Sequence, residues 1–162
     1  MIRKLGIGTA VTGALVITAG LALGAVTFHS GPTVTFSGIS ATATFNVSGL
    51  GNDPAYAFLD VAGTATYECR NKGGKAAPGQ NPVPAQGSSG PVELSNSQKN
   101  GRDDISVTAS LTAPPTPTPQ QAGCPNKPGT WSVVLTSLTA ASATLRIEQP
   151  LGNVIFGPQT YP

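Results

Sequence analysis

The chain has 162 residues, enough for one domain once an N-terminal leader is set aside, and only 10% of them are charged. The chain has nine Lys and Arg residues and seven Asp and Glu residues. Two of the nine, Arg3 and Lys4, belong to the leader, so the rest of the chain is formally neutral. Nucleic-acid binding needs clustered cations, and only the sparse set Arg70, Lys72 and Lys75 comes near one, so we expect no nucleic-acid partner.

The N-terminus has the pattern of a secretory signal peptide. Arg3 and Lys4 precede an uncharged stretch, residues 5–26, that is rich in Gly, Ala and Thr. Its small residues favour cleavage after Gly24, and cleavage after Ala25 is almost as well supported. An uncleaved membrane anchor is the competing interpretation, because about 20 uncharged residues can span a bilayer. The several glycines and the small-residue end favour cleavage.

Cleavage defines the expected domain organisation and location. Removal of residues 1–24 as a signal peptide leaves residues 25–162 as a single domain, which we expect to be secreted and to be extracellular or associated with the cell wall. No second apolar span follows the leader, so we expect no membrane contact after cleavage. Low charge with abundant Thr, Ser, Ala and Gly is typical of an extracellular β-protein.

The first predicted strand is ISATATFNVSGL, residues 39–50, in which apolar and polar residues alternate. The residues directed inward are Ile39, Ala41, Ala43, Phe45 and Val47. Val34 and Phe36, in the preceding TVTFSG, have the opposite parity. We therefore expect a bulge or a short kink near Gly38.

A turn at residues 49–54 leads to AYAFLDVAGTATYEC, residues 55–69, a long alternating strand that we expect to bend at Gly63. The residues directed inward are Ala57, Leu59, Val61, Gly63, Ala65, Tyr67 and Cys69. We expect this strand to form a hairpin with the first one. The outward threonines that would then stand side by side are Thr42, Thr44, Thr64 and Thr66. Such an array could order water or bind ice, but strand propensity and cross-strand contacts are the favoured explanation.

Residues 70–90 have no apolar period and are predicted to form a long loop, which in a compact domain signals function or mobility. PVELSNS then predicts a short strand with Val92 and Leu94 inward, and Asn100-Gly101 predicts a tight hairpin turn. The strand DDISVTASLT follows, with alternating inward residues. These are Ile105, Val107, Ala109 and Leu111.

Residues 113–129 are a second predicted loop, rich in proline and therefore extended and stiff. TWSVVLTSLTA mixes both parities, which indicates a strand that is covered on both faces or shifted by a bulge, and we expect Trp131 in the core. SATLRIEQ predicts a further strand, and NVIFGPQTYP a last one at an edge. The inward residues of SATLRIEQ are Ala143, Leu145 and Ile147.

Cys69 and Cys124 are the only cysteines, and two cysteines in an exported chain are expected to form one disulfide. The bond would join a strand end to a loop and place the two predicted loops side by side. His29 is the only histidine, so a cysteine–histidine metal site cannot be assembled. The stretches GNDP and RDD supply too few oxygens for calcium. We expect no metal and no cofactor.

Seven to nine short strands with evenly spaced turn signals predict an all-β fold, an antiparallel β-sandwich of immunoglobulin-like kind. A closed barrel is the alternative. Trp131 follows the second cysteine instead of lying between the two, so the true immunoglobulin pattern is not met.

Three stretches carry a resemblance to a known group of proteins. They are GTATYECRNKGG at residues 63–74, GPVELSNSQKNGRDDISVTASL at residues 90–111 and GCPNKPGTWSVVL at residues 123–135. They are similar to small secreted proteins of actinobacteria, and the likeness covers most of the chain after the leader. The resemblance implies an exported, two-cysteine β-domain, assigns no activity and carries over no catalytic residue.

Catalytic chemistry has little support in the sequence. With His29 next to the cleavage region as the only histidine, no Ser-His or Cys-His nucleophile can be built in the ordinary way. Asp60 and Glu68 share a face but lie about 26 Å apart along a strand, too far for the carboxylate pair of a glycosidase. Asp103-Asp104 suits a turn. We therefore expect that the protein is not an enzyme.

We predict a secreted, non-catalytic protein that acts by surface contact at the cell envelope or in the extracellular matrix, with cell-wall or extracellular polysaccharide or protein as partner. The candidate residues on the two predicted loops are Arg70, Lys72, Lys75, Asn126 and Lys127. Two alternatives stay open. One is a carbohydrate-binding module, for which exposed aromatic rings are few. The other is a protease inhibitor that presents the loop tethered by Cys124.

Overall fold

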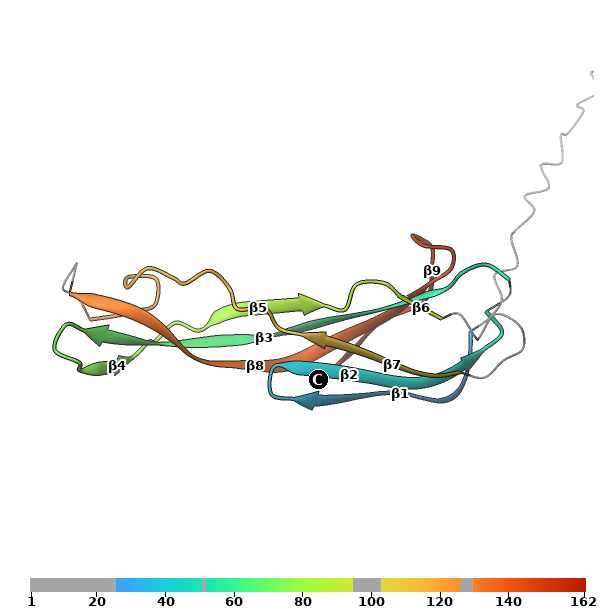
Figure 1. The fold of residues 1–162 in the computed structure, drawn as a ribbon, viewed down its shortest axis with the longest axis horizontal. Coiled ribbons are helices and arrows are strands. Elements are labelled where there is room, and N and C mark those ends of the chain that lie inside the picture. The colour runs from blue at the N-terminus through green and yellow to red at the C-terminus, as the bar shows by residue number, and fades with distance from the viewer. Residues whose placement is uncertain (1–25, 51, 95–102, 126–129) are drawn as a thin grey trace, which may run out of the picture.

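The computed structural model describes residues 26–50, 52–94, 103–125 and 130–162, and every regular element within them is a β-strand (Figure 1). The strands are β1 (Thr27–Ser37), β2 (Ser40–Ser48), β3 (Tyr56–Asn71), β4 (Ala76–Pro78), β5 (Val83–Ser88), β6 (Val92–Glu93), β7 (Asp103–Ser110), β8 (Trp131–Glu148) and β9 (Val154–Tyr161). The predicted leader and the predicted Asn100-Gly101 turn lie outside the described residues.

The strands form two antiparallel sheets, so the predicted all-β antiparallel class is confirmed. The smaller sheet has the order β1-β2-β7 and the larger one the order β4-β3-β8-β9. β3 is the central strand of the larger sheet. It pairs with β8 from Tyr56 to Asn71 on one edge, and with β4, β5 and β6 in turn on the other.

One hydrophobic core is shared by the facing sides of the two sheets. The alternation in the sequence correctly predicts which side chains enter it, because successive side chains of a strand point to opposite faces. The predicted inward residues that are buried include Ala41, Ala43, Phe45 and Val47 of β2, Ile105, Val107 and Ala109 of β7, and Ala143, Leu145 and Ile147 of β8. Ile39 is an exception, because it is 43% exposed.

Ile39 is exposed because the chain reverses at this point. Ser37 pairs with Ser40, so Gly38 and Ile39 form a two-residue turn between β1 and β2. The prediction of a bulge or kink near Gly38 is therefore wrong in kind. A two-residue hairpin pairs odd-numbered with even-numbered residues, such as Phe36 with Ala41, which explains the change of parity. Gly38 has a φ of 58°, a conformation that glycine adopts without strain.

The predicted hairpin between β2 and β3 is also wrong, because these strands belong to different sheets. Thr42 lies opposite Thr108 of β7, whereas Thr64 lies opposite Thr139 of β8. The four threonines therefore form no common array. The segment between Ser48 and Tyr56 instead carries the chain from the smaller sheet to the larger one.

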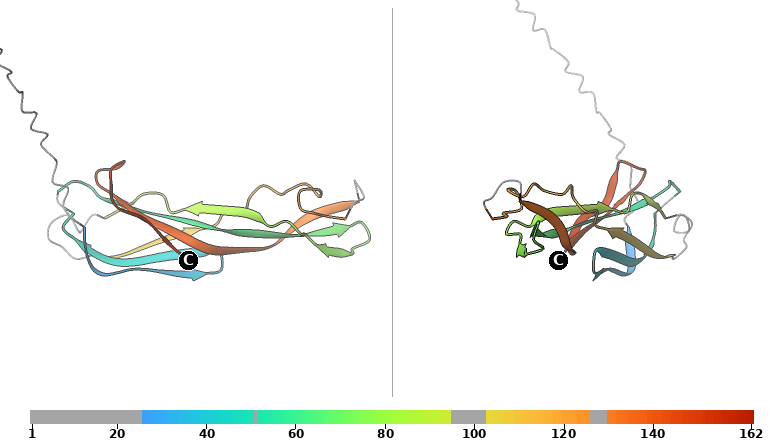
Figure 2. Two further views of the ribbon diagram at one scale, coloured as in Figure 1. Left: turned by 180° about the vertical axis from the view of Figure 1, so that it is seen from behind. Right: turned by 60° about the vertical axis from the view of Figure 1, so that its left-hand side comes forward.

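The molecule is elongated, because β3 and β8 extend far beyond the smaller sheet (Figures 1 and 2). We call this extension the arm; it comprises β3 from Gly63 onward, β4, and β8 as far as Ala140. The rest is called the body. Residues 70–90, predicted to be an irregular loop, contain β4 and β5, which pair with β3. That prediction is wrong because short edge strands need no apolar period.

Two register shifts in the pairing of β3 with β8 mark the arm. One falls between Ala62 and Gly63, where a bend was predicted, and the other between Thr66 and Tyr67. Each places an extra residue in β8 and reverses its parity, so the predicted bulge explains the mixed pattern of TWSVVLTSLTA. Trp131 lies opposite Asn71 and is only half-buried outside the core, contrary to the prediction.

Candidate functional site

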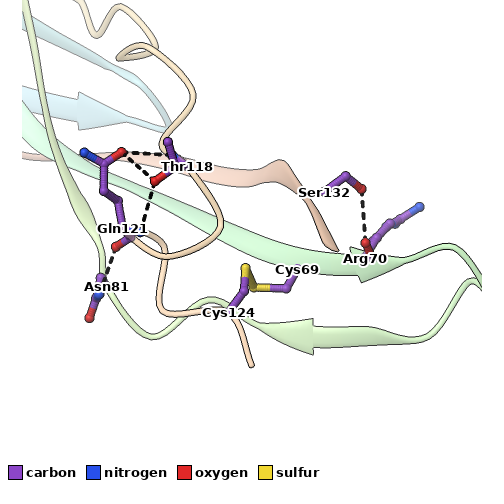
Figure 3. The surroundings of a disulfide bond; sticks show 7 residues. All are labelled: Cys69, Arg70, Asn81, Thr118, Gln121, Cys124 and Ser132. Carbon is purple, nitrogen blue, oxygen red and sulfur yellow. Dashed lines mark hydrogen bonds between the residues drawn. A yellow bond between two sulfur atoms is a disulfide. The ribbon is translucent and has the colours of Figure 1, made fainter. Parts of the chain in front are cut away.

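A disulfide joins the far end of β3 to the proline-rich segment, as predicted. Cys69 and Cys124 are bonded, and Cys69 is completely buried (Figure 3). The alternation of β3 directs Cys69 to the inner face of the sheet, where the segment from Ala113 to Pro125 passes. Cys124 belongs to no strand, so the bond links a strand end to an irregular segment.

Hydrogen bonds hold this segment against the chain between β4 and β5. The carbonyl of Ala122 accepts bonds from the backbone N–H groups of Gln80 and Asn81 at 3.0 and 3.4 Å. The side-chain amide of Asn81 donates to the carbonyl of Gln121 at 2.8 Å (Figure 3). Gln121 in turn accepts from the backbone N–H of Thr118 at 2.9 Å. The two segments that were predicted to lie side by side therefore do so.

The tip of the arm is a compact turn between β3 and β4. The side-chain oxygen of Asn71 accepts hydrogen bonds from the backbone N–H groups of Gly73 and Lys75, both at 2.9 Å. The backbone N–H of Gly74 donates to the carbonyl of Asn71 at 3.0 Å. This internal bonding fixes the turn and leaves the side chains of Lys72 and Lys75 exposed.

Three of the predicted surface residues meet at this tip, namely Arg70, Lys72 and Lys75. Arg70 forms an ion pair with Glu68, whereas no carboxylate pairs with Lys72 or Lys75 among the described residues. The other two, Asn126 and Lys127, lie outside the described residues. The protease-inhibitor alternative, which depends on them, therefore rests on the sequence alone.

The charges of the described side chains are separated along the molecule. The arm carries Arg70, Lys72 and Lys75 against the single carboxylate of Glu68. Among the described side chains, the body carries one cation, Arg146, and five carboxylates. These are Asp53, Asp60, Glu93, Asp104 and Glu148. Over the side chains that the structure describes, the arm is therefore basic and the body acidic.

Arg146 is the centre of a polar cluster on the outer face of the larger sheet. It donates to Asp60 at 2.6 Å and to Glu148 at 2.9 Å, and its guanidinium lies 4.2 Å from the ring centroid of Phe58. The backbone N–H of Gly152 donates to the other oxygen of Glu148 at 2.7 Å. This bond, and then the bond from Arg146, lower the pKa of Glu148, while the pKa of Arg146 is raised chiefly by its bond to Glu148.

A shallow groove of about 500 Å³ lies beside this cluster, where β5 borders β3. Its lining offers one carboxylate, one amide and three hydroxyls to a ligand. The polar lining residues are Asp60, Gln86, Ser88, Ser142 and Thr144. The sequence did not single out this groove, because the five residues come from three strands and no local motif unites them.

Hydroxyl and amide side chains also cross the outer face of the smaller sheet in paired rows. The Oγ atoms of Ser40 and Ser110 lie 2.7 Å apart, and the Oγ1 atoms of Thr42 and Thr108 lie 2.9 Å apart. These groups bond one another across the strands, which supports their interpretation as pairs that stabilise the sheet.

No group of three or more His, Cys, Asp and Glu side chains that could hold a metal ion occurs within the part of the chain that the structure describes. The same residues include no helix long and apolar enough to cross a membrane. Comparison with protein-family models, with curated proteins and with solved structures found no match to the chain.

Proposed function

We propose that the protein is an exported, non-catalytic β-sandwich of immunoglobulin-like kind that binds an anionic polymer of the cell envelope or extracellular matrix through the tip of its arm. A disulfide supports export, because such bonds persist in oxidising compartments. The apolar leader and the resemblance to secreted two-cysteine proteins of actinobacteria support it as well. Two antiparallel sheets around one core support the sandwich assignment.

The observation that carries this proposal is the position of Lys72 and Lys75. Both are exposed on a turn that is fixed by hydrogen bonds to Asn71, at the end of an arm that is clamped by a disulfide. A rigid turn loses little conformational entropy when it binds. Five of the six described carboxylates lie in the body and the sixth, Glu68, is paired with Arg70, so the tip is the part of the described structure that attracts an anionic polymer.

The polar cluster around Arg146 supports the non-catalytic part of this proposal. Asp60 and Glu148 are bridged by the guanidinium of Arg146, which occupies the position where a substrate or water would have to stand. A general acid at neutral pH needs a raised pKa, whereas the pKa of Glu148 is lowered. The cluster is suited to stabilising the sheet.

Co-sedimentation with insoluble polymers tests the proposal. The exported protein should bind peptidoglycan that carries an anionic phosphodiester polymer, and binding should be lost when that polymer is removed chemically. Added salt should weaken binding, because the screening length is only about 10 Å at 0.1 M ionic strength. The double variant Lys72→Gln, Lys75→Gln should lose most of the binding.

The matched control is the double variant Lys99→Gln, Arg102→Gln, which removes the same net charge from the chain between β6 and β7. It should bind as the wild-type protein does. Equal loss in both double variants would show that only net charge matters, and the tip would then have no special role. Binding that survives both polymer removal and high salt would also contradict the proposal.

A carbohydrate-binding protein is the second candidate, and the groove at Gln86 favours it. Hydroxyl, amide and carboxylate groups along a shallow groove are suited to hydrogen bonding with sugar hydroxyls. Binding to chitin or cellulose that is insensitive to salt, and that Gln86→Ala weakens while the lysine substitutions do not, would favour this function over the first.

A further inference from the structure

The part of β8 that lies in the arm has one unpaired edge. β8 pairs with β3 from Trp131 to Glu148, but β9 covers its other edge only from Ala143 to Glu148. Near the body, the backbone N–H of Ala140 donates to the carbonyl of Gly38 at 3.1 Å. From Trp131 to Thr139, no other described strand pairs with this edge. An edge of this kind offers a row of backbone donors and acceptors to another strand.

The other strand edges of the described residues carry features that hinder pairing. β1 contains Pro32 and two register shifts, and β9 contains Pro158 and two register shifts. The shorter edge strands are β4, which ends at Pro78, β5, which contains Pro84, and β6, which has two residues. β7 carries Asp104 at one end, and the carbonyl of Ser110 at its other end lies against Gly87. Proline, charge, shortness and bulges are the usual means by which edges are protected.

The exposed edge of β8 has none of these features in its first five residues. Residues 130–145 contain neither a charged residue nor a proline. Val134 is 38% exposed and Leu135 is 39% exposed, and the two side chains point to opposite faces of the sheet. The run from Trp131 to Leu135 is regular, because the register shift follows it. It is therefore a strand with an open edge and uncovered apolar side chains on both faces.

We propose that this edge pairs with the same edge of a second copy of the protein, antiparallel and about a twofold axis at Val133. The two arms then form one continuous sheet with the strand order β4-β3-β8-β8-β3-β4. Trp131 of each copy lies opposite Leu135 of the other, and Ser132 lies opposite Val134. The inference is independent of the proposed polymer binding.

The sequence of residues 131–135 favours a second copy of the protein as the partner of this open edge. Antiparallel pairing about Val133 places apolar side chains opposite apolar ones on the face that carries Trp131, Val133 and Leu135. No like charges meet across the pair, because the segment has none. Twofold pairing uses up both open edges and closes the assembly at two copies, because the remaining edges of the described strands are protected.

The full chain is expressed in a host that exports it, and the protein is recovered in the form that the host releases. Sedimentation velocity over a dilution series then tests the proposal. The wild-type protein should be a dimer that dissociates on dilution. Val134→Lys should raise the dissociation constant by about tenfold or more, because a lysine on an edge strand opposes strand addition. The matched control is Val154→Lys, which places the same charge at a 45% exposed valine of β9 and should leave the dimer intact.

Trp131 gives a second measurement, because it is the only tryptophan and lies at the proposed interface. Its fluorescence emission should shift to the blue as the dimer forms, and the shift should be absent in Val134→Lys at the same concentration. A wild-type protein that stays monomeric would overturn the proposal. So would a dimer that survives both Val134→Lys and Leu135→Lys, since its interface would then lie elsewhere.

Discussion

Leu59 and Leu145 lie directly opposite each other in the pairing of β3 with β8, and neither side chain is exposed. Leu59→Ala or Leu145→Ala should each lower the free energy of unfolding by about 2–5 kcal/mol, because a buried cavity replaces the lost side chain. The double variant should lose less than the sum, since the two cavities merge. Urea titration measures all three. Leu151→Ala, at a 59% exposed position, is the control and should change the free energy by less than about 0.5 kcal/mol.

Removal of the disulfide should loosen the arm before the body. The bond spans a sequence separation of 55 residues. The chain-entropy model therefore assigns it at most roughly 4 kcal/mol of stability. In Cys69→Ala, Cys124→Ala, amide hydrogen exchange should accelerate in the arm and in the segment from Ala113 to Pro125. Equal acceleration in β2 and β7 would contradict the division into arm and body.

Gly63 should not tolerate a side chain. A Cβ atom at this position would lie 2.1 Å from the carbonyl oxygen of Thr139 and 2.8 Å from Leu111, so either β8 or the core would have to shift. Gly63→Ala should therefore destabilise the protein by roughly 1–3 kcal/mol in urea titration. Gly73→Ala is the matched control, because its new Cβ would come no closer than 3.4 Å to Asn71. If the Gly63→Ala protein were as stable as this control, the close approach of β3 and β8 at Gly63 would not be needed for stability.

Glu148 should make stability depend on pH in the acid range. Its pKa in the folded protein lies below the ordinary value of 4.5, because Gly152 and then Arg146 donate hydrogen bonds to the carboxylate. The folded state therefore binds this proton less readily than the unfolded state does. The resulting stabilisation is complete above the ordinary value and is lost as the pH falls through the lowered pKa. The free energy of unfolding should decrease over that interval, and less so in Glu148→Gln. Glu93→Gln, at an exposed position, should leave the decrease unchanged.

The burial of individual side chains could be predicted from the sequence because it depends on local alternation. Ala41, Phe45, Ile105 and Leu145 were assigned to the interior from the pattern alone, and the structure confirms them. The position of Cys69 on the inner face of a long strand followed from the same parity. The two segments that the disulfide brings together could therefore be named in advance, and three of the candidate cations do meet at the tip of the arm.

The pairing of strands could not be predicted in this way, because alternation states which face is buried and not which strand is the neighbour. β2 pairs with β7, so Thr42 finds its partner in Thr108 and not in the next strand of the chain. The turn at Gly38 was missed because Ile39 continues the apolar alternation of β2 into the turn. The groove at Gln86 and the separation of charge exist only after distant strands have come together.

The separation of the described charges gives this elongated molecule (Figure 1) a permanent electric dipole along its long axis. On a negatively charged scaffold such a particle would be adsorbed upright, with its lysine-bearing end down. A layer formed in this way would be as thick as the particle is long. It would also repeat the sign of the scaffold at its outer boundary, since aspartate and glutamate would face the medium. Coverage would then continue beyond a single layer, because the acidic ends would attract the lysine-bearing tip of a further particle as the scaffold attracts the first.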